Sequence, residues 1–193
     1  MKFYCADHHF GHARILELCG RPFSCVEEMD EAMIARHNER VEKSDDVYFV
    51  GDFGFASDQK YMQHVFGRMK GRKHLVVGNH DKKAVLRLPW ASPPKDRMKV
   101  DDEGRTIVLS HYAERVWDRM YRGAYHFFGH THGKLPGVGR STDVGVDAWD
   151  FRPVTANEAI ARMLEWNPDF DTYAPEEPSV IRGPLPQVSS PSM

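Results

Sequence analysis

The stretch Leu75-Val76-Val77-Gly78-Asn79-His80-Asp81 decides how this chain is interpreted. It is a short apolar run that stops at a glycine and then presents three polar side chains. Four other apolar runs end in the same way, at Asp7-His8-His9, Gly51-Asp52, Ser110-His111 and Gly129-His130-Thr131-His132. Such runs of β-branched and aromatic residues are typical of strands buried on both faces, which carry ligands at their carboxyl ends. We therefore expect the five polar ends to meet at one edge.

The side chains that collect at this edge are Asp, His and Asn, which are ligands of divalent metals. The candidates are Asp7, His9, Asp52, Asn79, His80, Asp81, His111, His130 and His132. A lone His or Asp after a strand is more often a capping or hydrogen-bonded group than a ligand, so the prediction depends on the recurrence of the pattern. Burial of so many ionisable groups is costly unless they are paired or bound to metal.

The number of candidates favours two metal ions that share a carboxylate. Imidazole, carboxylate and amide oxygen together suit manganese, iron or zinc better than magnesium or calcium alone. Two ions about 3.5–4 Å apart can bind a phosphate between them, activate a bridging water and stabilise both oxygens of an in-line displacement. The residues therefore predict a hydrolase of phosphate esters.

Length and composition indicate one soluble domain. The chain has 193 residues, of which 41% are hydrophobic and 28% charged, as is ordinary for globular proteins. Its net charge of -2 does not indicate nucleic acid or an anionic membrane as a partner. An apolar strand close to Met1 leaves no room for a signal peptide, and no apolar stretch approaches the roughly 20 residues of a membrane span. Three cysteines without CxxC spacing fit the reducing cytoplasm.

Strands and amphipathic segments alternate in the first half of the chain, as in βαβ units. We expect helices at 13–18, 26–42 and 57–69; His37 and His64 fall on helix faces that look exposed and are assigned no role. In the second half we expect a hairpin of 98–100 with 105–109, a short helix at 113–121, strands at 125–128 and 141–146, and a helix from the capping box at Thr155 to about Trp166. Residues 167–193, rich in Pro and Ser, are expected to be a disordered tail or an extended strap.

These blocks resemble the calcineurin-like metallophosphoesterase superfamily over residues 1 to about 165. All five are intact and in the family's order, and the Gly78-Asn79-His80-Asp81 and Gly129-His130-Thr131-His132 blocks are the most specific. Phe10-Gly11-His12, Arg21-Pro22-Phe23 and residues 144–149 further resemble a small bacterial and phage subgroup. The resemblance implies an α/β protein with a four-layered α/β/β/α sandwich of two mixed sheets, here as one domain over residues 1–166.

The resemblance also implies a role for each block. Asp7, His9 and His132 would hold one ion, Asn79, His111 and His130 the other, and Asp52 would bridge them. Manganese is favoured, with iron, zinc or nickel as alternatives. A metal-bridging hydroxide would attack phosphorus in line, and His80 would protonate the leaving oxygen. Asp81 would accept a hydrogen bond from His80 and keep it protonated and oriented.

One departure from the family bears on the substrate. Its protein phosphatases follow the Gly-Asp block with a tract ending in Arg-Gly, whose arginine binds the phosphate dianion, whereas Gly51-Asp52 is followed here by Phe53-Gly54-Phe55. A diester carries one charge fewer and needs that arginine less, so a phosphodiesterase on a small, nucleotide-like substrate is favoured. His12 and Arg21 are candidates for contacting the phosphate. The alternatives are a phosphomonoesterase or nuclease on the same site, and a binding scaffold without catalysis; the oligomeric state is left open.

Overall fold

The computed structural model describes residues 1–55 and 58–166, which form two sheets and the helices around them. The first sheet is parallel, in the order β1 (Lys2–Cys5), β2 (Asp46–Val50), β3 (Arg72–Val76). The second is mixed, in the order β4 (Arg97–Asp102), β5 (Arg105–Ser110), β6 (Tyr125–Phe128), β7 (Ser141–Asp143), with β4 and β5 antiparallel and the other pairs parallel. The α-helices are α1 (Ile15–Cys19), α2 (Val26–Arg40), α3 (Gln59–Arg68), α4 (Lys83–Leu86) and α5 (Ala156–Trp166).

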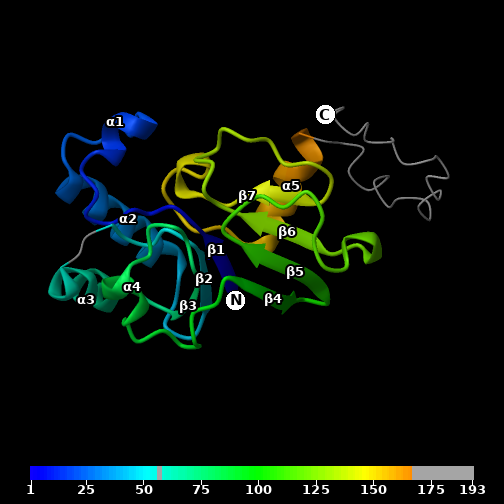
Figure 1. The fold of residues 1–193 in the computed structure, drawn as a ribbon, viewed down its shortest axis with the longest axis horizontal. Coiled ribbons are helices and arrows are strands. Elements are labelled where there is room, and N and C mark those ends of the chain that lie inside the picture. Colours follow the sequence, from blue (N-terminus) through cyan, green and yellow to red (C-terminus); the bar gives the residue numbers. More distant parts are fainter. Residues whose placement is uncertain (56–57, 167–193) are drawn as a thin grey trace, which may run out of the picture.

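The layers follow from strands whose two faces are both buried. Along β1, Phe3 and Cys5 point into a core shared with α1, α2, α3 and α4, whereas Tyr4 points into a second core between the sheets. Helix α5 adds Ala159 and Met163 to this second core and contacts β1 and β7. Figure 1 shows α1 to α4 on one side of the first sheet and the second sheet on its other side. The predicted α/β architecture with two packed sheets is confirmed.

The predicted helix at 113–121 is wrong. In the structure, only the short 3₁₀ turn η1 (Met120–Arg122) forms near this segment. Trp117 is buried with Val108 and Ala124 on the outer face of the second sheet, and its Nε1 donates a hydrogen bond to the Ala124 carbonyl at 2.8 Å. The segment therefore wraps over the sheet around one anchored indole instead of forming a helix.

The other predicted elements are present within a few residues of their expected bounds. The capping box of α5 forms as expected, because the Thr155 amide donates to Glu158 Oε2 at 2.8 Å and the Glu158 amide donates to Thr155 Oγ1 at 3.3 Å. The proposed tail at 167–193 lies outside the described residues. None of the helices in the described part of the chain is both long and apolar enough to cross a membrane.

His37 is buried, contrary to the exposed position expected from the pattern of α2. Its Nε2 donates a hydrogen bond to the Lys70 carbonyl at 2.9 Å, which joins α2 to the segment before β3. Burial is the main cause that lowers the pKa of His37, to about 4. The hydrogen bond to the Lys70 carbonyl raises this pKa, whereas the charges of Lys73 and Lys70 lower it further. His37 is therefore a neutral part of the first core.

This burial predicts a pH dependence of stability. The unfolded chain, with a His pKa of about 6.5, binds more protons at this position than the folded chain between pH 6.5 and 4. The contribution of His37 to the free energy of unfolding is therefore complete above about pH 6.5. As the pH falls below this value, the free energy of unfolding decreases by about 1.4 kcal/mol per pH unit. Denaturant unfolding of the metal-free protein from pH 7.5 to 4.5 measures this loss. His37→Gln should show a shallower decline than the wild type, and exposed His64→Gln the same decline; equal declines in all three would contradict it.

Candidate metal centre

The first group of candidate ligands contains Asp7 and His9 from the loop after β1 and His132 from the loop after β6. One ligand atom from each lies within 4.8 Å of the others. Both carboxylate oxygens of Asp7 accept the His130 amide, at 3.0 and 2.8 Å, which joins the two loops. Without metal, burial raises the pKa of Asp7 to about 7, against the opposing effect of the His132 charge.

The second group contains Asp52 after β2, His111 after β5 and His130 after β6, and their ligand atoms also lie within 4.8 Å of one another. Asn79, in the loop after β3, adds its Oδ1 at 3.0 Å from His111 Nε2. The Nδ1 of His111 donates to the Val50 carbonyl at 3.0 Å, so that Nε2 faces Asn79 and Asp52. The side chains predicted for the second ion thus lie together.

Asp52 lies between the two groups. Its Oδ2 is 3.5 Å from His9 Nε2 and 3.4 Å from His111 Nε2, while its Oδ1 accepts the His80 amide at 2.8 Å. Burial alone would raise the pKa of Asp52, but the hydrogen bond and charge of His111, with the His80 amide and the His9 charge, lower it to about 2. One ionised oxygen therefore faces a histidine from each group.

Most of the ligand candidates have strained backbone conformations. Asp7, His9, Asp52, His130 and His132 have φ values of 59°, 54°, 54°, 69° and 50°, in the left-handed region that residues other than glycine rarely adopt. Each such residue costs of the order of 1–3 kcal/mol, and such residues cluster at functional sites. The strained backbone at these five residues therefore lowers stability, which is typical of residues placed for a function.

The donor set fits divalent metal ions. His9 is buried, and within the described part of the chain neither of its ring nitrogens has a hydrogen-bond partner. An orphaned buried imidazole is costly unless a ligand satisfies it. Imidazole nitrogens together with carboxylate and amide oxygens suit manganese, iron or zinc.

Glycines surround the carboxylates so closely that no side chain fits. A Cβ at Gly78 would lie 2.2 Å from Asp52 Oδ1 and 2.4 Å from the Asp52 amide, and a Cβ at Gly145 would lie 2.6 Å from Asp7 Oδ2. The glycine in the Gly78-Asn79-His80-Asp81 block is therefore required for the two loops to approach each other. The same argument applies to Gly51, whose Cβ would lie 2.1 Å from His111 Nδ1.

Gly78→Ala should consequently displace Asp52. We expect the free energy of unfolding to fall by about 1–3 kcal/mol, because an overpacked site must shift its backbone, and we expect weaker metal binding. The matched control is Gly67→Ala in α3, where a Cβ meets nothing within 4 Å, and which should stabilise the helix by up to about 1 kcal/mol. Denaturant unfolding and metal content of both variants check this; a Gly78→Ala protein that matches the wild type in both would contradict it.

Asp81 does not play the predicted role. Its carboxylate accepts the backbone amides of Gly78 at 2.8 Å, Asp52 at 3.0 Å and Phe53 at 2.9 Å, and the structure gives no hydrogen bond from His80 to it. Burial raises the pKa of Asp81 to about 7, in spite of these amides. Asp81 therefore fixes the loops after β2 and β3 to each other. Its carboxylate is not directed to the His80 ring.

The structure does not place Arg21 where it could contact the phosphate, contrary to the prediction. Its side chain is fully buried and bonded to Asp147 through two hydrogen bonds of 2.8 and 2.7 Å. Asp147 in turn accepts a hydrogen bond from His132 Nδ1 at 2.7 Å. Asp147 was missed from the sequence as a site residue, although it lies in the block at 144–149 that carries the subgroup resemblance.

His80 and His12 lie beside the ligand groups. The ring centroid of His80 is 5.3 Å from that of His9, and His80 belongs to neither metal-type group in the described residues. The His12 ring lies 5.4 Å from His9 and stacks on Phe55 with centroids 3.9 Å apart. Burial is the main cause that lowers the pKa of His12, and the charge of His80 lowers it further. Both histidines are placed to contact a molecule bound at the ligand groups.

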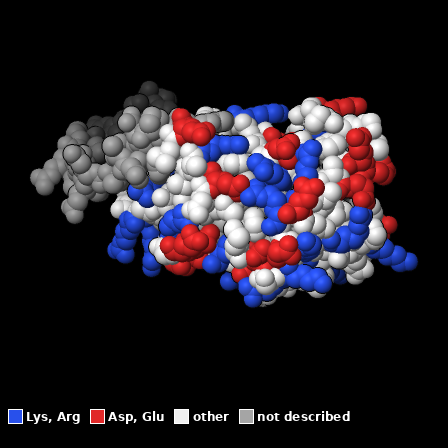
Figure 2. Space-filling view, turned by 180° about the vertical axis from the view of Figure 1, so that it is seen from behind, with Lys and Arg blue, Asp and Glu red and all other residues white. Residues whose placement is uncertain are grey.

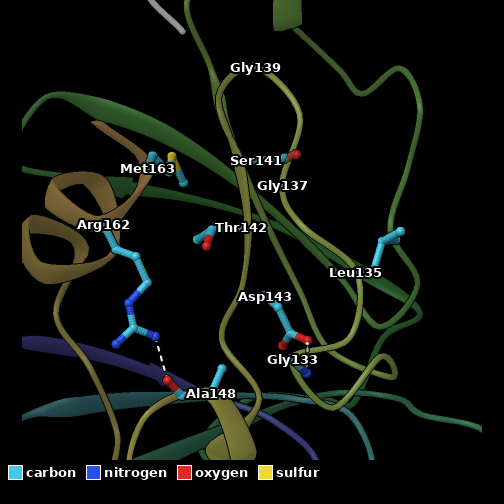
Figure 3. Close-up of a pocket in the computed structure, with 10 residues that line it drawn as sticks. All are labelled: Gly133, Leu135, Gly137, Gly139, Ser141, Thr142, Asp143, Ala148, Arg162 and Met163. Carbon is cyan, nitrogen blue, oxygen red and sulfur yellow. Dashed lines mark hydrogen bonds between the residues drawn. The ribbon is translucent and has the colours of Figure 1, made fainter. Parts of the chain in front are cut away.

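A small pocket behind the His130–His132 loop is separate from the ligand groups. It has a volume of about 30 Å³ and is lined by Gly133, Asp143, Ala148, Arg162 and Met163, among other residues. Figure 3 shows Arg162, from α5, bonded to the Ala148 carbonyl at one side of the pocket, and Asp143 bonded to Gly133. This volume suits about one water molecule. The pocket is therefore too small for a nucleotide.

No family model matches the chain. It is 28% identical to the uncharacterised protein MJ1445 of Methanocaldococcus jannaschii, over 84% of this chain and 90% of that protein. It is 26% identical to the Gene 66 protein of Mycobacterium phage D29, over 84% of this chain and 96% of that protein.

One solved structure has the same fold. A protein of unknown function from Aquifex aeolicus, AQ665, matches with a TM-score of 0.69 and 22% identity over 84% of this chain and 98% of that chain. The two proteins share a fold. YfcE, a phosphoesterase from E. coli, is also similar, with a TM-score of 0.40 and 15% identity over 75% of this chain and 77% of that chain. The resemblance to the calcineurin-like metallophosphoesterases is carried by the sequence blocks.

Proposed function

We propose that this chain is a phosphoesterase that depends on two metal ions. The observation that carries the proposal is the position of Asp52, whose Oδ2 lies within 3.5 Å of a histidine from each of two ligand groups. Asp7, His9 and His132 would hold one ion and Asn79, His111 and His130 the other, with Asp52 shared. Manganese is the favoured metal. When bound, the ions would supply Lewis acidity and lower the pKa of a water molecule between them.

The chain's own residues would then position the ester and move the proton. His80 lies beside His9, outside both ligand groups, so its imidazole is free to donate a proton to the leaving oxygen. The backbone bond from the His80 amide to Asp52 Oδ1, at 2.8 Å, would hold this imidazole at a fixed place relative to the shared carboxylate. His12 would contact the substrate from the same side.

A diester is the favoured substrate class. Phe53, which follows the Gly51-Asp52 block, is buried in the first core and cannot contribute a charge. Arg21 is fully engaged with Asp147 and two backbone carbonyls, so it cannot clamp a dianion. A phosphodiester carries one negative charge and requires less of this compensation than a monoester dianion.

Two exposed aromatic rings beside the centre favour a substrate with a planar group. Phe55 is 44% exposed and its ring lies 5.2 Å from that of His80, whereas Tyr112 is 52% exposed and lies 4.7 Å from His130. Stacking of a base on an aromatic side chain contributes about 1–3 kcal/mol. A nucleotide-like diester would use this stacking contact and would not need a basic surface. On the face drawn in Figure 2, Lys and Arg side chains (blue) are interspersed with Asp and Glu side chains (red).

Turnover with manganese of bis-p-nitrophenyl phosphate and p-nitrophenyl phosphate tests the reaction class. The diester should be hydrolysed faster, and faster turnover of the monoester would refute the diester preference, while no turnover of either would refute the phosphoesterase.

A second comparison tests the planar group. Phe55→Ala and Tyr112→Ala should each raise the KM for a cyclic nucleotide by about 5- to 100-fold, the equivalent of one stacked base, and leave turnover of a methyl phosphodiester unchanged. Exposed Val116→Ala serves as the control. Equal losses on the nucleotide and the methyl ester would argue against stacking.

A further inference from the structure

A buried guanidinium joins the loop after β1 to Asp147, which follows β7. Arg21 Nη2 donates to the Asp7 carbonyl at 2.6 Å, and Nη1 donates to the His8 carbonyl at 2.9 Å. The same side chain donates from Nε and Nη2 to the two carboxylate oxygens of Asp147, at 2.8 and 2.7 Å. Arg21 therefore fixes the backbone at Asp7, where φ is 59°, and holds Asp147 in a fixed orientation.

Asp147 transmits this orientation to a candidate ligand. Its Oδ2 accepts a hydrogen bond from His132 Nδ1 at 2.7 Å. With Nδ1 as the donor, Nε2 carries the free lone pair, and the imidazole cannot rotate without breaking the bond. A carboxylate behind a ligating histidine fixes its tautomer and raises its basicity, and loss of such a partner typically costs 10–100-fold in metal affinity.

Cys19, His132 and Asp147 also lie within 4.8 Å of one another and form a third group of metal-type side chains. Both oxygens of Asp147 are already bonded to the guanidinium of Arg21, whose positive charge would repel a cation at this place. The group therefore does not compete as a metal site, and Asp147 serves the orientation of His132.

We infer that Arg21 and Asp147 are positioning residues for one ion alone, the ion held by Asp7, His9 and His132. This inference rests on the proposed dinuclear centre. The other ligand group is held differently, because His111 Nδ1 donates to the Val50 carbonyl at 3.0 Å and makes no bond to Asp147. Loss of the Arg21–Asp147 pair should thus weaken the binding of one ion and leave the binding of the other unchanged.

Titration of the metal-free protein with Mn²⁺, with unbound Mn²⁺ counted by electron paramagnetic resonance, tests the inference. The wild type should bind two ions and show the spectrum of a coupled pair. Asp147→Asn and the double variant Arg21→Gln/Asp147→Asn should bind one ion with nearly unchanged affinity and the second about 10–100-fold more weakly, with the spectrum of a single ion at low metal. The double variant decides the case if a single variant fails to fold, because it leaves no unpaired buried charge.

The matched control is another arginine–carboxylate pair, Arg40 with Glu158, in which Arg40 Nη2 donates to both carboxylate oxygens at 2.8 Å and joins α2 to α5. Arg40→Gln/Glu158→Gln should bind two ions as the wild type does. Two ions of unchanged affinity in the Arg21→Gln/Asp147→Asn protein, or an equal loss in the control, would overturn the positioning role. A wild-type protein that binds no Mn²⁺ would instead overturn the dinuclear centre, and the inference with it.

Discussion

Asp52→Asn is expected to abolish the activity and to remove most of the bound metal. Asp52 Oδ2 lies 3.5 Å from His9 Nε2 and 3.4 Å from His111 Nε2, so its negative charge serves both ligand groups. The amide has nearly the same size and can still accept the His80 amide, which confines the change to the charge. We expect turnover to fall by about 10³-fold or more, equivalent to about 4 kcal/mol of transition-state stabilisation.

Metal content after dialysis, together with turnover at saturating Mn²⁺, measures both effects. Asp118→Asn is the control, because Asp118 is exposed and forms an ion pair with Lys99 away from the ligand groups. An Asp52→Asn protein that keeps two ions per chain would show that the shared carboxylate is not a ligand, whatever its activity.

His80→Ala has the second largest expected effect, and it should separate chemistry from metal binding. His80 belongs to neither ligand group, and its contact with Asp52 is made by the backbone amide, which alanine retains. Both ions should therefore stay bound. Turnover should fall by about 10²–10⁴-fold, the usual contribution of a general acid.

The identity of the leaving group sharpens this prediction. An ester of a simple alcohol needs a proton on its leaving oxygen, whereas p-nitrophenolate leaves without one, so the loss should be larger for the alkyl ester. Metal analysis and turnover of both esters make the measurement, with His64→Ala as the exposed control. Loss of metal from His80→Ala, or an equal loss of turnover with the two esters, would show that His80 is not the general acid.

The convergence of the ligand candidates within each sheet could be predicted from the sequence because it depends on strand direction. Asp52 and Asn79 follow neighbouring parallel strands of the first sheet, and His111 and His130 follow neighbouring parallel strands of the second. Runs of apolar residues locate the strands, and parallel strands bring their carboxyl ends to one edge. No knowledge of side-chain conformation is needed for this step.

The roles of Arg21 and Asp81 could not be predicted in this way, because they depend on side-chain contacts. Arg21 looked like a loop residue, yet its partner Asp147 lies 126 positions further along the chain. The resemblance implied a pair of Asp81 with His80, but the turn directs the Asp81 carboxylate to three backbone amides instead. The helix predicted at 113–121 failed for a similar reason, since burial of Trp117 outweighs the local pattern.

Crystals of the protein grown with Mn²⁺, and an anomalous difference map recorded from them, test the central claim most directly. We expect two peaks about 3.5–4 Å apart, with one Asp52 oxygen between them, His9 and His132 at one peak and His111 and His130 at the other. A single peak, or peaks away from Asp52, would contradict it.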